Sequence, residues 1–94
     1  MEVVTIARSF RVDLTLEQYL SIEALDAVHE EKDAATLYDL LRASGADLIE
    51  YNGHFGASIF FTLPDELQNR LADIILLINS YIYTAKEKGY IECH

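Results

Sequence analysis

The chain has very little cysteine, since Cys93 is the only one among 94 residues. A single cysteine cannot form a disulfide within the chain, so the fold does not depend on one. Proteins of reducing compartments rarely contain disulfides, and we therefore expect a cytoplasmic protein. Cys93 also lies too near the end of the chain to have the rigid, partly enclosed surroundings of a catalytic thiol.

Long hydrophobic runs are also absent. The longest run spans five residues, 74–78, whereas a membrane-spanning helix needs about 20. The first residues lack the basic region and the long apolar stretch of a signal peptide. We expect no membrane segment and no targeting sequence.

Basic residues are scarce. The chain has 7 lysines and arginines against 16 aspartates and glutamates, and its formal net charge is −9. Nucleic acids and anionic lipid surfaces are polyanions, so this charge opposes direct binding to either. We therefore expect the partner to be a basic protein surface, and neither nucleic acid nor membrane.

Motifs for metal binding, cofactor binding or catalysis are missing. The three histidines, His29, His54 and His94, do not have the spacing of metal ligands on a helix or hairpin. No serine lies in a nucleophile-elbow pattern, and no glycine-rich loop is present to hold a phosphate. Asp47 and Glu50 are carboxylates suited to acid or base chemistry if the sheet has a concave mouth. We expect no metal, no cofactor and no enzymatic activity.

The chain does contain much apolar material, with 51% hydrophobic and 11% aromatic residues. This content is enough to offset the entropy of ordering the chain, so we expect a folded protein. A chain of this length has room for one hydrophobic core. We therefore predict a single domain over residues 1–94.

The clearest periodic pattern predicts a helix over residues 65–88. Its apolar residues recur every three or four positions: Leu67, Leu71, Ile74, Ile75, Ile78, Tyr81, Ile82 and Ala85. This spacing places one apolar stripe along a helix. Asp65 and Gln68 have the spacing of a capping box, and Gly89 follows at a position that favours a left-handed residue.

Alternation of apolar and polar residues predicts a strand over residues 4–14, with Arg8 as the one breach. Thr15 and Gln18 have the spacing of another capping box, so a helix is expected to begin near Leu16. The alternation continues a little further along the chain, and a longer strand is the alternative. The helix-forming residues that follow favour the helix.

A second helix is predicted over residues 34–44. Asp33 is a suitable N-cap, and Gly45 is a suitable residue to end the helix. Residues 30–33 carry no apolar side chain, so they interrupt the pattern between the two helices. The pattern leaves open whether the helices nevertheless join into one bent rod.

Two segments rich in isoleucine, tyrosine and phenylalanine, 48–51 and 57–63, predict a pair of strands. The Asn52-Gly53 pair between them tolerates the positive φ angles of a tight turn, so the strands should form a hairpin. Residues 90–94 are long enough for a short terminal strand, and a frayed end is the alternative.

The predicted order is therefore a strand, two helices, a hairpin, a long helix and an optional final strand. Helices on one face of a small antiparallel sheet make an α+β fold. A ferredoxin-like βαββαβ arrangement, with its first helix split in two, fits this order best. The fold hosts many unrelated functions, so it carries little functional information.

Negative charge is concentrated in residues 13–39, which hold eight acidic residues and one lysine, a net charge of −7. Three of these carboxylates recur at helical spacing and are predicted to share one face of the first helix. The candidate partner-binding residues on this face and at the tip of the predicted hairpin are Tyr19, Glu23, Asp26, Glu30, His54 and Phe55. The alternative is an acidic face that only keeps the protein soluble.

A second apolar surface is predicted on the long helix. Ala72, Leu76 and Tyr83 lie opposite its main apolar stripe and would face water if only one side is packed. Exposed apolar patches often mark interfaces, so we predict self-association as a homodimer through these three residues. The alternative is burial under the second helix or the C-terminal tail.

These features favour a non-enzymatic acidic protein that binds a basic surface of another protein, for example one that normally binds nucleic acid. Charge would steer the encounter, and apolar and aromatic side chains would supply affinity. In size and charge the chain is similar to small inhibitors made by phages and mobile elements, although no motif assigns it to a family. The alternative function is a dimeric small-molecule-binding regulatory domain that uses the cleft between a helix and a strand edge.

Overall fold

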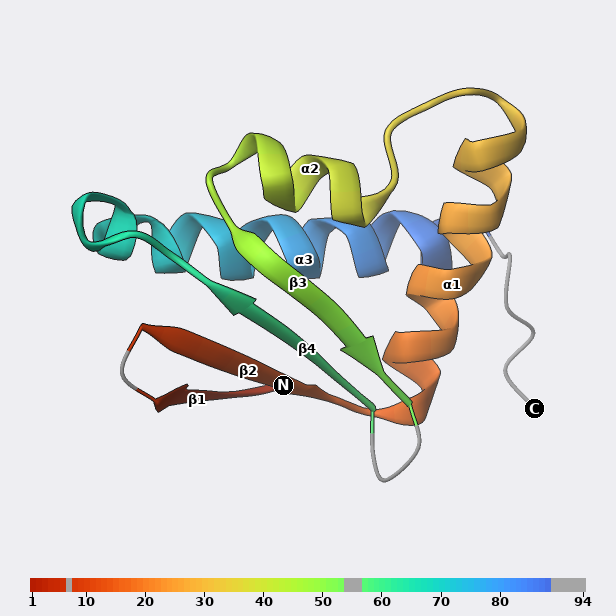
Figure 1. Ribbon diagram of the computed structural model, residues 1–94. Helices are drawn as coiled ribbons and strands as arrows, with labels where there is room; N and C mark the ends of the chain where they lie inside the picture. Colours follow the sequence, from red (N-terminus) through yellow and green to blue (C-terminus); the bar gives the residue numbers. More distant parts are fainter. Residues whose placement is uncertain (7, 54–56, 89–94) are drawn as a thin grey trace.

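The computed structural model describes residues 1–6, 8–53 and 57–88, and it has an α+β fold. The elements in chain order are β1 (Glu2–Ile6), β2 (Ser9–Leu14), α1 (Leu16–Glu31), α2 (Leu37–Ala43), β3 (Asp47–Asn52), β4 (Ala57–Thr62), the 3₁₀ helix η1 (Asp65–Arg70) and α3 (Leu71–Glu87). The four strands form one antiparallel sheet in the order β1-β2-β4-β3. The helices lie against one face of this sheet (Figure 1).

The sheet contains the split β-α-β connection of the ferredoxin-like fold. β4 lies between β2 and β3, and these two strands run parallel to one another and are joined through α1 and α2. The edge position beside β2 is filled by β1, which precedes β2 in the chain. In a βαββαβ sheet the strand after the last helix has that position. The predicted terminal strand at residues 90–94 lies outside the described residues.

The prediction of a single strand over residues 4–14 is wrong, because two strands form a hairpin in which Ile6 pairs with Ser9. Arg8, the one residue that does not fit the alternation, lies in the turn. Its carbonyl oxygen accepts a hydrogen bond from the Leu63 amide at 3.2 Å. The turn has no clear sequence signal, because the sequence between Ile6 and Ser9 contains no glycine, asparagine or aspartate.

α1 begins with the predicted capping box. The Gln18 amide donates to the Thr15 hydroxyl oxygen at 3.1 Å, and the Thr15 amide donates to the Gln18 side chain at 2.9 Å. Asp33, the predicted N-cap of the next helix, instead ends α1 with a φ of +59°, and the amide that follows it donates back into the last turn at 2.7 Å. The second helix therefore starts later, with Thr36 as its N-cap, and is separate from α1.

The helix predicted over residues 65–88 is divided. Its first six residues form the 3₁₀ helix η1, and α3 follows. The predicted capping box does not form, because the Gln68 side-chain amide donates to the Leu63 carbonyl oxygen at 2.7 Å. The Asp65 carboxylate lies 2.9 Å from the Arg8 guanidinium, which ties the start of η1 to the first hairpin.

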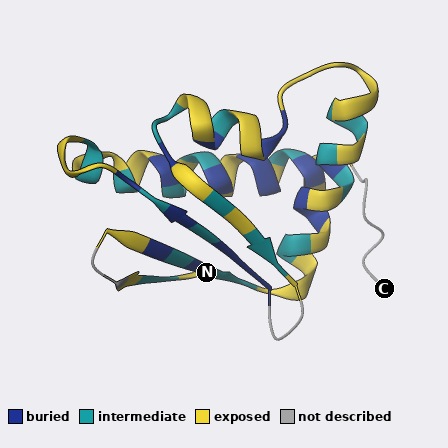
Figure 2. Cartoon of the chain, in the orientation of Figure 1, coloured by how far each residue is buried: buried dark blue, intermediate teal, exposed yellow. Residues whose placement is uncertain are grey.

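The hydrophobic core lies between the sheet and the helices (Figure 2). Phe10 and Val12 of β2 are buried, as the alternation predicts, and the Phe10 ring centre lies 5.5 Å from that of Phe61 on β4. Other buried members of the core are Ile22, Leu25, Leu37, Leu41, Ala46, Ile59, Leu63, Ile74, Ile78, Tyr81, Ile82 and Ala85. This packing leaves the outer sides of α1 and α3 and the open face of the sheet outside the core.

β3 is irregular near its start. Its pairing with β4 shifts register between Asp47 and Glu50, which marks a β-bulge. Leu48 lies in this bulge with a φ of +50° and a side chain that is 73% exposed. Leucine rarely adopts the left-handed conformation, so this position holds backbone strain.

Candidate protein-binding surface

α1 turns six residues away from the core. These residues, which we call the α1 stripe, are Leu16, Leu20, Glu23, Ala27, Glu30 and Glu31, and all of them are exposed. At about 100° per residue they fall within roughly a third of the helix circumference. Leu16 is 65% exposed and Leu20 is 42% exposed. The stripe is therefore apolar in its first turns and acidic toward its C-terminal end.

The inward side of α1 carries polar side chains beside the buried Ile22 and Leu25. Ser21 is fully buried, and its hydroxyl donates to the Glu17 carbonyl oxygen at 2.8 Å. His29 is half-buried, and its Nδ1 atom donates to the Ala35 carbonyl oxygen, which can only accept, at 2.8 Å. α1 thus holds satisfied polar groups inside while it exposes two leucines.

Asp26, a predicted partner-binding residue, is half-buried and bonded within the protein. Its Oδ1 atom accepts hydrogen bonds from the Leu37 amide at 3.0 Å and from the Tyr81 hydroxyl. Burial, and then the bond to this carboxylate, raises the pKa of Tyr81 above its usual value. Asp26 thereby ties α1 to α2 and α3. Of the three carboxylates on the predicted acidic face, only Glu23 and Glu30 are exposed.

Tyr19, another predicted partner-binding residue, is also half-buried. Its ring meets that of Tyr51 on β3 edge-on, with ring centres 6.4 Å apart. Burial, and then a hydrogen bond to Glu23, raises the pKa of Tyr19. Tyr19 therefore packs on β3 and borders the α1 stripe. His54 and Phe55, the predicted residues at the hairpin tip, lie outside the described residues.

The ion pairs of the described residues lie away from the acidic end of the α1 stripe. They join Arg8 to Asp65, Arg11 to Asp13, Arg42 to Asp47 and Lys86 to Glu17. The described residues include every lysine and arginine of the chain, and among them none pairs with Asp33 or with the three glutamates of the stripe. Within the described residues, four exposed carboxylates therefore have no ion-pair partner: Glu23, Glu30, Glu31 and Asp33.

The three predicted self-association residues lie on the outer side of α3, and we call them the α3 ridge. Leu76 is 65% exposed, Tyr83 is 67% exposed, and Ala72 is exposed one turn before Leu76. Burial under the second helix, one of the two alternatives to self-association, does not occur. The other alternative, burial under the C-terminal tail, involves residues 89–94, which lie outside the described residues. The ridge is therefore an apolar surface open to solvent.

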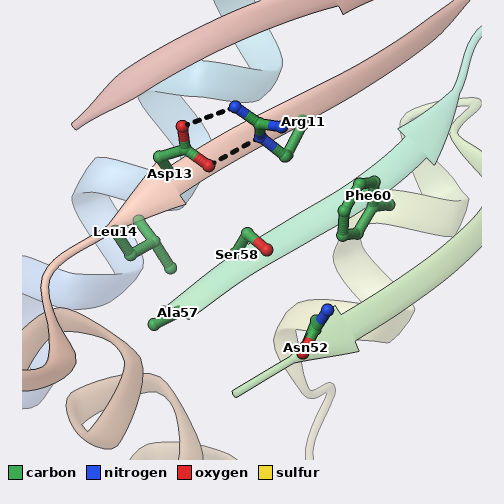
Figure 3. A pocket seen from close by; sticks show the side chains of 7 residues that line it. All are labelled: Arg11, Asp13, Leu14, Asn52, Ala57, Ser58 and Phe60. Carbon is green, nitrogen blue, oxygen red and sulfur yellow. Dashed lines mark hydrogen bonds and ion pairs between the residues drawn. The ribbon is translucent and has the colours of Figure 1, made fainter. Parts of the chain in front are cut away.

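The open face of the sheet has a hollow of about 400 Å³ beside the ends of β3 and β4 (Figure 3). Asn52, Ser58 and Phe60 line it together with Arg11 and Asp13. The Arg11 guanidinium is held by both carboxylate oxygens of Asp13, at 2.8 and 3.1 Å. Its charge is largely offset by this pair, so the hollow offers polar contacts without a strong anion site.

The carboxylates considered for acid or base chemistry are surface groups. Asp47 accepts a hydrogen bond from the Leu48 amide at 2.9 Å and lies 3.5 Å from the Arg42 guanidinium. Glu50 is exposed on the edge strand β3. No group of three histidine, cysteine, aspartate or glutamate side chains that could hold a metal ion occurs within residues 1–6, 8–53 and 57–88.

Comparison with known proteins gives no match. No protein-family model, no curated protein and no solved structure matches this chain. Among the helices that the structure describes, none has the length and apolar character needed to cross a membrane. The function has to be inferred from the surfaces of the protein.

Leu16 and Leu20 are surface residues that the sequence pattern did not single out. Apolar positions are spread widely around α1, so hydrophobicity alone does not identify its buried side. A helical wheel centred on Glu23 and Glu30 does place both leucines beside these glutamates. The inward side is instead marked by residues whose polar groups are satisfied locally or by other helices, such as Ser21 and Asp26.

Proposed function

We propose that this protein is a non-enzymatic binding protein that uses the α1 stripe to contact a basic surface of another protein. The observation that carries this function is the exposure of Leu16 and Leu20 on the same side of α1 as the three glutamates of the stripe. Full burial of a leucine is favourable by about 1.5–3 kcal/mol. Two exposed leucines one turn apart therefore indicate a contact surface.

The two parts of the stripe would contribute differently to binding. The leucines would supply apolar contact area, and the glutamates would attract cations at longer range. With a net charge of −9, the protein would meet basic surfaces faster and would be repelled by polyanions. A partner site with lysine or arginine beside an apolar groove would match both parts.

A nucleic-acid-binding surface is a basic surface of this kind, and the protein would act there as a nucleic-acid mimic. An inhibitor of the type made by phages and mobile elements, acting in the cytoplasm, fits the size, the charge and the single cysteine of the chain. Such an inhibitor would compete with nucleic acid for its target. Added salt would weaken its binding, because the attraction depends on charge.

The test compares how variants of the α1 stripe bind the partner captured from the source cells. Leu16→Ser with Leu20→Ser should weaken binding at least about tenfold, because the apolar contact is lost. Glu23→Gln with Glu30→Gln should mainly slow association and reduce the salt dependence. Surface plasmon resonance at two salt concentrations measures both effects.

Matched controls separate the stripe from general surface changes. Leu48→Ser removes another exposed leucine, and Glu2→Gln with Glu50→Gln removes two exposed glutamates from the sheet. We expect these controls to bind the partner much as the wild type does. Stripe variants that bind as tightly as their controls would overturn the proposed function.

A dimeric small-molecule-binding domain is the second candidate, and the hollow of about 400 Å³ on the sheet favours it (Figure 3). A ligand present at about 100 times its dissociation constant stabilises the folded protein by about 2.7 kcal/mol. A thermal-shift screen against common metabolites would detect such a ligand. A shift that Phe60→Ala abolishes would support this function, and a flat screen would speak against it.

A further inference from the structure

β1 is an edge strand, and within residues 1–6, 8–53 and 57–88 it pairs only with β2 (Figure 1). Its five residues follow one continuous register and include no proline and no lysine. Proteins protect edge strands from further pairing with bulges, prolines or charged side chains. β3, the other edge, has such protection in the bulge around Leu48 and in the exposed Asp47 and Glu50. β1 has a charge only at its first residue, Glu2, so it is the edge of this sheet that is open to pairing.

The pairing of the sheet shows which backbone groups of β1 point outward. The Leu63 amide donates to the carbonyl oxygen of Arg8, which lies directly opposite it when the β2–β4 register is continued by one residue. Hydrogen-bonded and non-hydrogen-bonded pairs alternate along antiparallel strands, so every second residue of β2 after Arg8 bonds to β4, and the residues between them bond to β1. The residues of β1 opposite the latter set are Glu2, Val4 and Ile6. The amides and carbonyl groups of Val3 and Thr5 therefore point away from β2, toward the open edge.

The side chains of β1 also suit a further strand. Val3 is half-buried against the core, and Thr5 is exposed on the same face of the sheet. Val4 is half-buried on the open face, where it lies opposite Arg11 of β2. Valine and threonine are β-branched and pack well against one another across neighbouring strands. A second β1 strand offers the same side chains and the same outward backbone groups at the same spacing.

We propose that β1 pairs with β1 of a second copy of this chain, antiparallel, about a two-fold axis that passes between the two Val4 residues. In this register Val3 is opposite the partner's Thr5, and the axis repeats the pair. These two pairs form four hydrogen bonds and use every outward amide of both strands. Two-fold registers centred on Val3 or on Thr5 would instead pair some of these amides with residues beyond the ends of β1.

The side chains near the axis fit this register. Val4 meets the partner's Val4 as a non-hydrogen-bonded pair, in which the Cα atoms are about 4.5 Å apart and the side chains are closest. Glu2 lies about 14 Å along the strands from the partner's Glu2, at about 3.4 Å per residue, so these like charges stay apart. In a parallel pair in register they would be adjacent and would repel. The antiparallel dimer has one eight-stranded sheet with the helices of both copies on the same face.

The length of β1 bounds the strength of this dimer. The strand has five residues, so the contact is small beside the at least about 1,200 Å² of a stable interface. Each copy also carries a net charge of −9, so the two copies repel. We expect a reversible dimer with a dissociation constant on the order of 100 μM, which tightens as salt screens the repulsion. The α1 stripe lies on another element and its proposed binding weakens with salt, so failure of the dimer would leave that function standing.

Cysteine cross-linking tests the position of the axis. In a Cys93→Ser background, Val4→Cys places one cysteine of each copy at the axis, where a Cα separation of about 4.5 Å suits a disulfide. Glu2→Cys is the matched control, because it lies on the same strand and the same face but about 14 Å from its own copy. Oxidation near the dissociation constant should give a covalent dimer for Val4→Cys only. Cross-linking at both positions, or at neither, would overturn the proposal.

Removal of an outward amide tests the backbone pairing by analytical ultracentrifugation. The mass of the wild type should rise with concentration from 10.7 kDa toward twice that value. Thr5→Pro removes two of the four hydrogen bonds between the copies and should weaken dimerisation at least about tenfold. The single chain should tolerate this proline, because the Thr5 amide points away from β2 and edge strands accept proline at such positions.

Thr5→Val is the matched control, because it changes the same side chain and keeps the amide, and it should dimerise as the wild type does. Circular dichroism of each variant shows whether the fold is intact. A wild type that stays monomeric well above the expected dissociation constant would overturn the dimer. A folded Thr5→Pro variant that dimerises as tightly as Thr5→Val would overturn the proposed strand pairing.

Discussion

Tyr51 places a phenol hydroxyl inside the protein, where it has no hydrogen-bond partner among the described residues. Its ring packs against the core, so the hydroxyl loses contact with water and gains no bond in return. A buried group left unsatisfied costs about 1–3 kcal/mol. We expect Tyr51→Phe to increase the free energy of unfolding at pH 7 by about 1 kcal/mol in urea denaturation. Tyr19→Phe is the control and should show no gain, because the Tyr19 hydroxyl bonds to Glu23.

The same tyrosine makes the stability depend on alkaline pH. Burial, and then the charge of Asp26, raises the pKa of Tyr51 above its unfolded value of about 10. The folded protein keeps this proton at pH values where the unfolded chain has lost it. The contribution of the protonated Tyr51 hydroxyl to the free energy of unfolding is therefore complete below about pH 10, and it falls by about 1.4 kcal/mol per pH unit above that pH. Tyr51→Phe should remove this part of the dependence of the unfolding free energy on pH. If the variant keeps both the wild-type dependence on pH and the wild-type stability at pH 7, water reaches the Tyr51 hydroxyl.

Leu48 holds a left-handed backbone in the bulge of β3. This conformation costs a residue with a Cβ atom roughly 1–2 kcal/mol, and glycine adopts it freely. Leu48→Gly should raise the free energy of unfolding by about 1 kcal/mol, after the greater entropy of glycine in the unfolded chain is allowed for. Leu48→Ala is the control, because it removes the same exposed side chain and keeps the backbone strain. Equal urea midpoints for Leu48→Gly and Leu48→Ala would mean that the backbone at residue 48 is not strained.

At the scale of the element, α1 departs from the usual amphipathic pattern, because Ser21 is buried beside Ile22 and Leu25 while Leu16 and Leu20 are exposed. Leu16→Gln with Leu20→Gln changes side chains that face solvent, so the free energy of unfolding should stay within about 0.5 kcal/mol. Ser21→Leu adds volume on the closed side and removes a hydrogen bond, with an expected loss of about 1–3 kcal/mol. Urea denaturation measures both. A large loss from the double leucine variant would mean that these leucines serve the fold, and the main support for the binding surface would disappear.

Elements were predictable from the sequence where the local pattern and the tertiary packing agree. The apolar stripe of α3, the Thr15 capping box and the β3–β4 hairpin follow from spacing and turn residues. The β1–β2 turn was not predictable, because the alternation continues through residues that rarely form tight turns. Asp33 misled the prediction because aspartate suits both an N-cap and the left-handed end of a helix.

The candidate binding surface was predictable only in part. Helical spacing places Glu23 and Glu30 together, and both are exposed. Asp26 shares that spacing but bonds to the Leu37 amide and the Tyr81 hydroxyl, which belong to two other helices. No local pattern indicates such a contact, because it exists only once the three helices have packed.

At the scale of the whole molecule, 16 acidic and 7 basic residues leave a net charge of −9. Each ion pair of the described residues is itself neutral and leaves this excess of negative charge in place, so the compact state repels itself more than the expanded chain does. Salt screens such repulsion over about 10 Å at 0.1 M. We expect the urea midpoint to rise between about 0.02 M and about 0.3 M NaCl, with an unchanged m value.

Neutral variants at the acidic end of α1 separate this repulsion from general effects of salt. Glu30→Gln with Glu31→Gln and Asp33→Asn removes three unpaired charges, and asparagine still tolerates the left-handed backbone at residue 33. Stability at low salt should rise and its salt dependence should shrink, because less repulsion remains to be screened. The same variant should bind a basic partner more weakly, since these charges supply the attraction. Greater stability together with weaker binding would mean that these charges serve partner binding and not the fold. A salt dependence of stability equal to that of the wild type would contradict self-repulsion at this end of α1.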